Sequence, residues 1–143
     1  MLQALIAEFE RLGCVILEAD TDGIYLSTEQ YYAKPEELLA LVVKIMPPGI
    51  ELEFDGSYDA MFCYKAKNYA LAANGEVTLR GSALRSRGIE PYLKRLSDQL
   101  IAYILGVSPD SPVAEVERLR KAITAREQPV GYLAKSETLS QNP

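Results

Sequence analysis

Apolar residues recur every three or four positions in several stretches of the chain, a spacing that predicts amphipathic helices. Prolines 35, 91 and 112 each stand where such a pattern begins, as expected at a first helical position. Gly13 and Gly106 stand where a pattern ends and can close a helix in a left-handed conformation. We therefore expect helices over residues 2–12, 35–46, 91–105 and 112–123.

Shorter apolar runs between these helices predict strands. Asn74-Gly75 separates two such runs and is the strongest hairpin signal in the chain. The other expected strands cover residues 14–17, 24–26, 50–54 and 61–64. The order of elements predicts an α+β fold: an antiparallel sheet with helices packed on one face, followed by a C-terminal helical segment. After Glu127 the chain is polar, and we expect a frayed C-terminus.

Composition limits the possible chemistry. The chain has 143 residues and no histidine, which excludes histidine triads and histidine-ligated zinc sites. Its apolar runs are too short for a membrane span and its N-terminus is too acidic for a secretory signal. We expect Cys14 and Cys63 to be reduced thiols in the core of a cytoplasmic protein. Any metal would be held by carboxylates and would be a hard cation such as Mg²⁺ or Mn²⁺.

Charge is distributed unevenly. The net charge is −5, yet the segment from Tyr64 to Arg95 holds seven basic and two acidic residues, a local net charge of +5. The remaining eight basic and eighteen acidic residues give −10. Phosphate contacts depend on charge within about a Debye length, ~8–10 Å, so the basic segment favours a polyanionic partner despite the acidic total.

The stretch "EADTDG" contains the first candidate site. Asp20 and Asp22 would project from the same side of a strand, with Glu18 behind them. Carboxylates this close are tolerated when they are exposed or when a divalent cation lies between them. A polar turn in which Asp and Gly only satisfy backbone geometry is the alternative. The spacing of a calcium-binding loop is absent.

Two basic motifs follow. Lys65, Lys67 and Tyr69 alternate in "YKAKNYA" and would share one face of a strand, where lysines can neutralise phosphates and a tyrosine can lie against a sugar or base. In "RGSALRSRG", arginines 80, 85 and 87 stand among small residues that a phosphate backbone could approach. A solvated strand face and an ordinary basic loop are the alternatives.

In combination, "DTD", "KNY" and "LRGSALRSRG" resemble the C-terminal part of the palm of family B DNA polymerases. The resemblance extends from Leu2 to about Tyr132. The chain departs from the family pattern beside the acidic motif, where Glu18-Ala19 replaces the usual Tyr-Gly and Gly23 replaces Ser. The added charge and the more flexible turn alter the fine geometry of this motif without removing a ligand.

The resemblance implies a role for each motif. Asp22 corresponds to the aspartate that ligates both Mg²⁺ ions (or Mn²⁺), and Asp20 to its weaker partner. Lys67 and Tyr69 correspond to the pair that grips the primer strand near its 3′ end. The remaining implied DNA contacts are Lys65, which would meet a phosphate, and Arg85 and Arg87 at the junction of palm and thumb.

The resemblance also implies that the chain is one piece of a larger enzyme. Residues 1–106 would be a palm fragment and residues 107–143 the start of the thumb. The second metal-binding aspartate and the lysine that grips the incoming dNTP would lie in upstream palm and fingers regions. We therefore expect weak metal binding and no activity from the chain alone, and activity on primer-template DNA in the parent. A non-catalytic nucleic-acid-binding or regulatory module that reuses the palm fold, and a structural domain with an unrelated acidic turn, are the alternatives.

Overall fold

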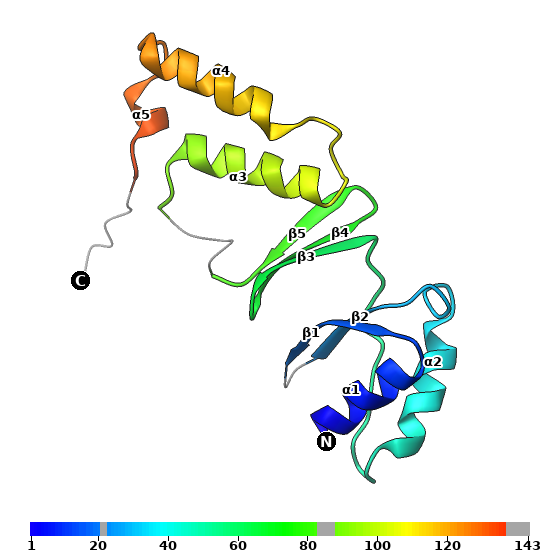
Figure 1. The fold of residues 1–143 in the computed structure, drawn as a ribbon. Helices are drawn as coiled ribbons and strands as arrows, with labels where there is room; N and C mark the ends of the chain where they lie inside the picture. The colour runs from blue at the N-terminus through cyan, green and yellow to red at the C-terminus, as the bar shows by residue number, and fades with distance from the viewer. Residues whose placement is uncertain (21–22, 83–87, 137–143) are drawn as a thin grey trace, which may run out of the picture. The chain divides into compact units, whose positions relative to one another are not determined.

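The fold divides into two compact units, Met1–Ser57 and Tyr58–Pro143, in a computed structural model of the chain (Figure 1). The structure describes residues 1–20, 23–82 and 88–136. Each unit has its own sheet and its own cluster of buried residues.

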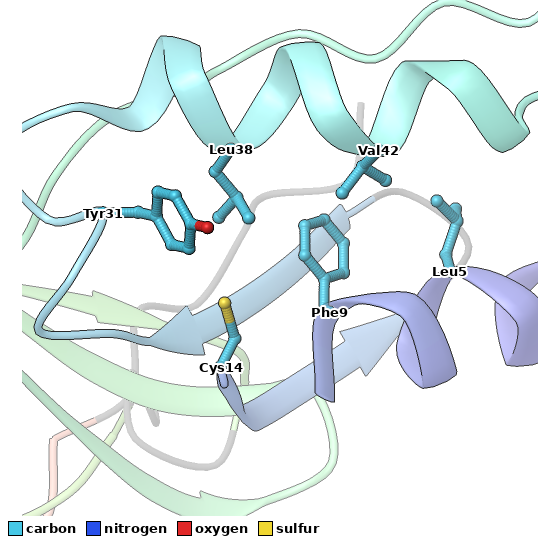
Figure 2. Packing of buried hydrophobic residues seen from close by; sticks show 6 residues of the cluster. All are labelled: Leu5, Phe9, Cys14, Tyr31, Leu38 and Val42. Carbon is cyan, nitrogen blue, oxygen red and sulfur yellow. The ribbon is translucent and has the colours of Figure 1, made fainter. Parts of the chain in front are cut away.

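The first unit packs helices against a two-stranded hairpin. Its elements are α1 (Leu2–Arg11), β1 (Val15–Asp20), β2 (Gly23–Ser27), α2 (Pro35–Val42) and the 3-10 helix η1 (Val43–Ile45). Phe9 of α1 points toward Val42 of α2 in Figure 2, and Val42 is fully buried. The core of this unit consists of Leu5, Phe9, Cys14, Tyr31, Leu38 and Val42.

The pairing of β1 with β2 separates an apolar face from a polar one. Ile16 pairs with Leu26, and Ile24 also packs against the core. Because side chains alternate along a strand, Gly23 and Tyr25 lie on the opposite face of β2, together with their partners Asp20 and Glu18. A β-bulge between Ile16 and Glu18 adjusts the register. Glu18 and Asp20 thus share the face that points away from the core.

The second unit is a three-stranded antiparallel sheet followed by helices. Its elements are β3 (Ala60–Lys65), β4 (Asn68–Ala73), β5 (Glu76–Arg80), α3 (Pro91–Ile104), α4 (Pro112–Thr124) and α5 (Val130–Leu133). The strands are ordered β3-β4-β5. Asn74 and Gly75 have φ angles of 53° and 77° and join β4 to β5, which confirms the hairpin predicted from this dipeptide.

Helix α3 covers one face of the β3-β4-β5 sheet, and α4 lies beyond it (Figure 1). Ala70 and Ala72 of β4 are buried against Ile101 and Leu105, so small strand residues leave room for large residues at the end of α3. Helices α4 and α5 contact α3 in turn. This packing leaves the opposite face of β4, with Tyr69 and Leu71, turned away from α3.

The α+β class, the antiparallel strands and the helical C-terminal part are confirmed. The strand expected over residues 50–54 is wrong, because residues 50–57 carry no strand. Alternation alone does not make a strand, since its backbone groups need a neighbouring chain to pair with. Leu52 instead packs against the first core, while Glu51 and Glu53 are exposed.

The cysteine expectation is correct for one residue and wrong for the other. Cys14 is buried, whereas Cys63 is exposed on the sheet face that points away from α3. The helices of the described residues include none with the length and apolar character needed to cross a membrane. The expected boundary at residue 106 stays a prediction about subdomains of the parent, and the expected frayed end at residues 137–143 lies outside the described residues.

Candidate functional site: an acidic hairpin and a basic hairpin

The acidic motif lies where β1 meets β2. Asp20 is the last residue of β1, pairs with Gly23 at the start of β2 and is partly buried. Glu18 is two residues earlier on the same face. Asp22, the main candidate ligand, lies outside the described residues. The described part of the hairpin thus brings two carboxylates onto one face.

The described carboxylates of the hairpin do not form a cluster of three ligands. Among residues 1–20, 23–82 and 88–136, no group of three Cys, Asp or Glu side chains is arranged to hold a metal ion. The oxygen ligands of Glu18 and Asp20 suit a hard cation such as Mg²⁺, which takes one or two protein carboxylates and keeps several waters. These residues therefore fit part of a magnesium site.

The basic motif forms the turn between β3 and β4. Lys65 is the last residue of β3, Lys67 lies in the turn with a left-handed φ of 60°, and Asn68 begins β4. The expectation that Lys65, Lys67 and Tyr69 share one face of a strand is therefore wrong. The chain reverses direction at Ala66 and Lys67, so Lys65 and Tyr69 belong to neighbouring antiparallel strands.

Asn68 secures this turn from within. Only 8% of Asn68 is exposed, and its Nδ2 donates a hydrogen bond to the Ala66 carbonyl oxygen at 2.9 Å. Gly81, the residue after β5, lies close against the same turn. The backbone at Lys67 is therefore held by the Asn68 side chain within the turn and by Gly81, which follows β5.

Tyr69 lies in the centre of a cross-strand row. Its partners are Cys63 on β3 and Arg80 on β5, all on the sheet face that points away from α3. Directly paired residues have Cβ atoms about 4.5–5.5 Å apart, so a guanidinium and an aromatic ring are neighbours here. Arg80, which the sequence suggested as part of a loop, is thus a strand residue at the candidate site. The Asn74-Gly75 turn could have predicted this position of Arg80 from the sequence, because the turn fixes the pairing of every residue in β4 and β5.

The other basic residues differ in their surroundings. Lys94 pairs with Asp98 at 2.7 Å and Arg95 pairs with Glu115 at 3.5 Å, so carboxylates neutralise part of the basic segment. Lys65 Nζ lies 5.5 Å from the centre of the Tyr64 ring, a cation–π distance. Arg85 and Arg87 lie outside the described residues. The described cations of the sheet are Lys65, Lys67 and Arg80.

Lys135 is a basic residue that sequence reasoning did not single out. A Cβ atom on Gly88 would lie 3.1 Å from Cε of Lys135, so this lysine is adjacent to the end of the "RGSALRSRG" segment. No local pattern could predict the proximity, because it depends on how α5 packs against α3. The ring centroids of Tyr92 and Tyr132 are 6.4 Å apart and belong to the same contact.

Comparisons with known proteins identify DNA polymerases as relatives. The chain is 28% identical over 132 residues to the DNA polymerase of Thermococcus sp. (strain 9oN-7), a match that covers 87% of this chain and 17% of that protein. It is 28% identical over 127 residues to DNA polymerase 1 of Pyrococcus abyssi, covering 83% of this chain and 16% of that protein. A third match, to the DNA polymerase of Methanocaldococcus jannaschii, is 34% identical over 83 residues, or 53% of this chain and 5% of that protein.

The resemblance to DNA polymerases that the motifs predicted is thereby confirmed. The chain spans roughly one sixth or less of the length of these relatives. No protein-family model matches the chain.

Proposed function

We propose that the chain is part of a family B DNA polymerase, namely the C-terminal part of the palm running into the thumb. The observation that carries the proposal is the extent of the similarity to the Thermococcus DNA polymerase. A match that covers 87% of the chain is too long to rest on any one of the motifs "DTD", "KNY" and "RGSALRSRG" alone. The parent protein would then be a DNA-directed DNA polymerase that acts in DNA replication or repair in the cytoplasm.

In this proposal the acidic hairpin supplies ligands for Mg²⁺, or for Mn²⁺. Asp22 would bind the metal and Asp20, the last residue of β1, would support it, because the two aspartates are one residue apart in the sequence. When bound, such a metal would supply Lewis-acid chemistry for activating a primer hydroxyl and for stabilising charge on a leaving group. The carboxylates of this chain hold and orient the ion, and the placement of Glu18 and Asp20 on one face supports that role.

The basic hairpin would hold the primer-template. Lys67 and Lys65 would contact backbone phosphates, while Tyr69 would lie against a sugar or a base edge. Arg80, next to Tyr69 across the strands, supports a DNA-facing role for this surface because it adds a planar, permanently charged phosphate ligand. Arg85 and Arg87 would continue the contact along the DNA backbone toward the thumb.

Catalysis would also require regions that we expect elsewhere in the parent protein. A second metal-binding aspartate and a lysine that grips the dNTP would come from upstream palm and fingers regions. With only part of the ligand set, the isolated chain would bind metal weakly and would not extend a primer. Its partners in the parent would be primer-template DNA, dNTP and those upstream regions.

Paramagnetic Mn²⁺ tests the metal role directly. On titration of the chain with Mn²⁺, we expect the amide signals of Asp20 and Gly23 to broaden weakly, without saturating at one equivalent. Asp22→Asn should remove this broadening because it removes the main ligand. The matched control Asp55→Asn changes one exposed carboxylate outside the hairpin and should leave the broadening unchanged.

Three results would each contradict part of this account. Tight, stoichiometric binding would mean that the hairpin is not an incomplete site. Broadening at the hairpin that survives Asp22→Asn would mean that the D-T-D motif is not the ligand. DNA binding without any metal effect at the hairpin would favour a non-catalytic nucleic-acid-binding module instead.

A further inference from the structure

The turn that carries Lys67 is in close contact with Gly81. Gly81 has a φ of +88°, and a Cβ atom at this position would overlap the Lys67 carbonyl oxygen and the Asn68 side-chain amide. The amide carbon of Asn68 would be 2.7 Å from that Cβ, closer than real Cβ contacts. Any side chain at position 81 would therefore displace either Gly81 or the turn.

The turn depends on such outside support. Lys67 adopts a left-handed conformation, which is unfavourable for a residue with a Cβ and needs support from its surroundings. On one side, Asn68 is buried and bonds to Ala66. On the other side, the Gly81 backbone lies against both Lys67 and Asn68. These two contacts impose the conformation.

We propose that Gly81 and Asn68 are positioning residues that hold the Lys67 backbone so that its ammonium group meets a DNA phosphate. The inference rests on the proposed function, because it takes DNA as the ligand of Lys67. A lysine has a long, flexible side chain, and a fixed backbone reduces the conformational freedom lost on binding. Because Arg80 precedes Gly81, the same contact also ties Arg80 to Lys67.

The inference predicts that Gly81→Ala, which changes no charge, removes the ionic contact between Lys67 and a DNA phosphate. Binding of the chain to a fluorescently labelled primer-template duplex would be measured by anisotropy as a function of salt. Each phosphate contact contributes about 0.9 to the slope of log K against log salt concentration. Gly81→Ala should lower the slope by ~1, as Lys67→Ala does, and the double variant should lose nothing further.

Gly75→Ala is the matched control. Gly75 has a similarly left-handed φ of +77° in the same sheet, but a Cβ there would meet nothing within 4 Å. Gly75→Ala places a Cβ atom at a left-handed glycine, as Gly81→Ala does, but it does not disturb the turn between β3 and β4 that carries Lys67. Its slope should equal that of the unmodified chain.

Other outcomes separate this inference from the proposed function. A Gly81→Ala slope equal to that of the unmodified chain would overturn the positioning role, and so would additive losses of slope in the double variant. If Lys67→Ala still lowers the slope in that case, the contact between Lys67 and DNA stands. An unchanged slope for Lys67→Ala would instead overturn the DNA contact itself. If Gly81→Ala does not fold, Asn68→Ala gives the same test, because it removes the bond to Ala66 without changing charge. A purely structural role for Asn68 would lower stability and leave the slope unaltered.

Discussion

Tyr69 combines two properties that nucleic-acid-binding surfaces use. Its ring can stack on a base or sugar, and its neighbour Arg80 can meet a phosphate. On its other side is Cys63, which is exposed and not part of a disulfide. This thiol is a natural reporter for whatever covers the sheet face.

The two cysteines should differ strongly in reactivity. Burial raises the pKa of the Cys14 thiol, which a hydrogen bond with Thr28 only partly offsets, so little of the reactive thiolate forms. With a chromogenic disulfide reagent at neutral pH we expect Cys63 to react fast and Cys14 to react only after denaturation. Because the pKa of the Cys14 thiol is raised, the difference in reaction rate between the two thiols should narrow only at more alkaline pH.

DNA extends this thiol measurement to the proposed interface. Primer-template DNA should slow the fast reaction, because Cys63 is next to Tyr69. The control Cys63→Ser should abolish the fast phase. Equal rates for the two thiols would contradict the difference in burial between Cys14 and Cys63. A fast rate that DNA does not change would contradict the proposed interface.

Individual side-chain environments were only partly predictable. The sequence placed both cysteines in apolar runs, but Cys63 faces away from α3 because of its position in the β3–β4 register. Its burial therefore depends on what covers each face of a sheet, which short-range patterns do not contain. The identity of the acidic and basic motifs was evident from residue types, whereas the proximity of Tyr69 and Arg80 needed the register.

At the scale of elements, local signals were reliable where the turn is set by its own residues. Asn74-Gly75 predicted the β4–β5 hairpin, and the prolines predicted the starts of α2, α3 and α4. The turn at Ala66 and Lys67 was missed because nothing in those two residues favours a left-handed conformation. Its support comes from Gly81, which is distant in sequence. The strand over residues 50–54 failed for the related reason that pairing partners are not encoded locally.

At the scale of the whole molecule, each of the two units has its own buried cluster. Leu38 belongs to the buried cluster of the first unit, and Leu71, which is 1% exposed, lies in the central strand of the second. Replacing either by Ala should cost about 2–5 kcal/mol of folding free energy. Native-state hydrogen exchange should report the loss in the affected unit, residues 1–57 for Leu38→Ala and from residue 58 onward for Leu71→Ala.

The exposed residue Thr78 provides the control for this pair. It lies on β5 opposite Leu71, and Thr78→Ala should change the free energy of unfolding far less than Leu71→Ala. Equal loss of protection throughout the chain in both leucine variants would contradict separate cores. It would mean that the chain unfolds as a single cooperative body.

The net charge of the whole chain does not predict whether the chain binds DNA. The net charge of −5 would disfavour DNA, whereas the described cations Lys65, Lys67 and Arg80 gather at one end of the β3-β4-β5 sheet. The fold class and the polymerase resemblance could be inferred from the sequence because both depend on the order of motifs. The arrangement that makes the basic hairpin a candidate interface depends on contacts between segments far apart in the chain.

The salt dependence of DNA affinity for Lys67→Ala tests the central claim most directly. Lys44 is a second exposed lysine, in η1 of the first unit, and Lys44→Ala makes the same change in net charge. If Lys67 contacts a phosphate of the primer-template, Lys67→Ala lowers the slope of log K against log salt concentration by ~1, and Lys44→Ala leaves it unchanged. Indistinguishable slopes for the two variants would contradict the assignment of this hairpin to DNA binding.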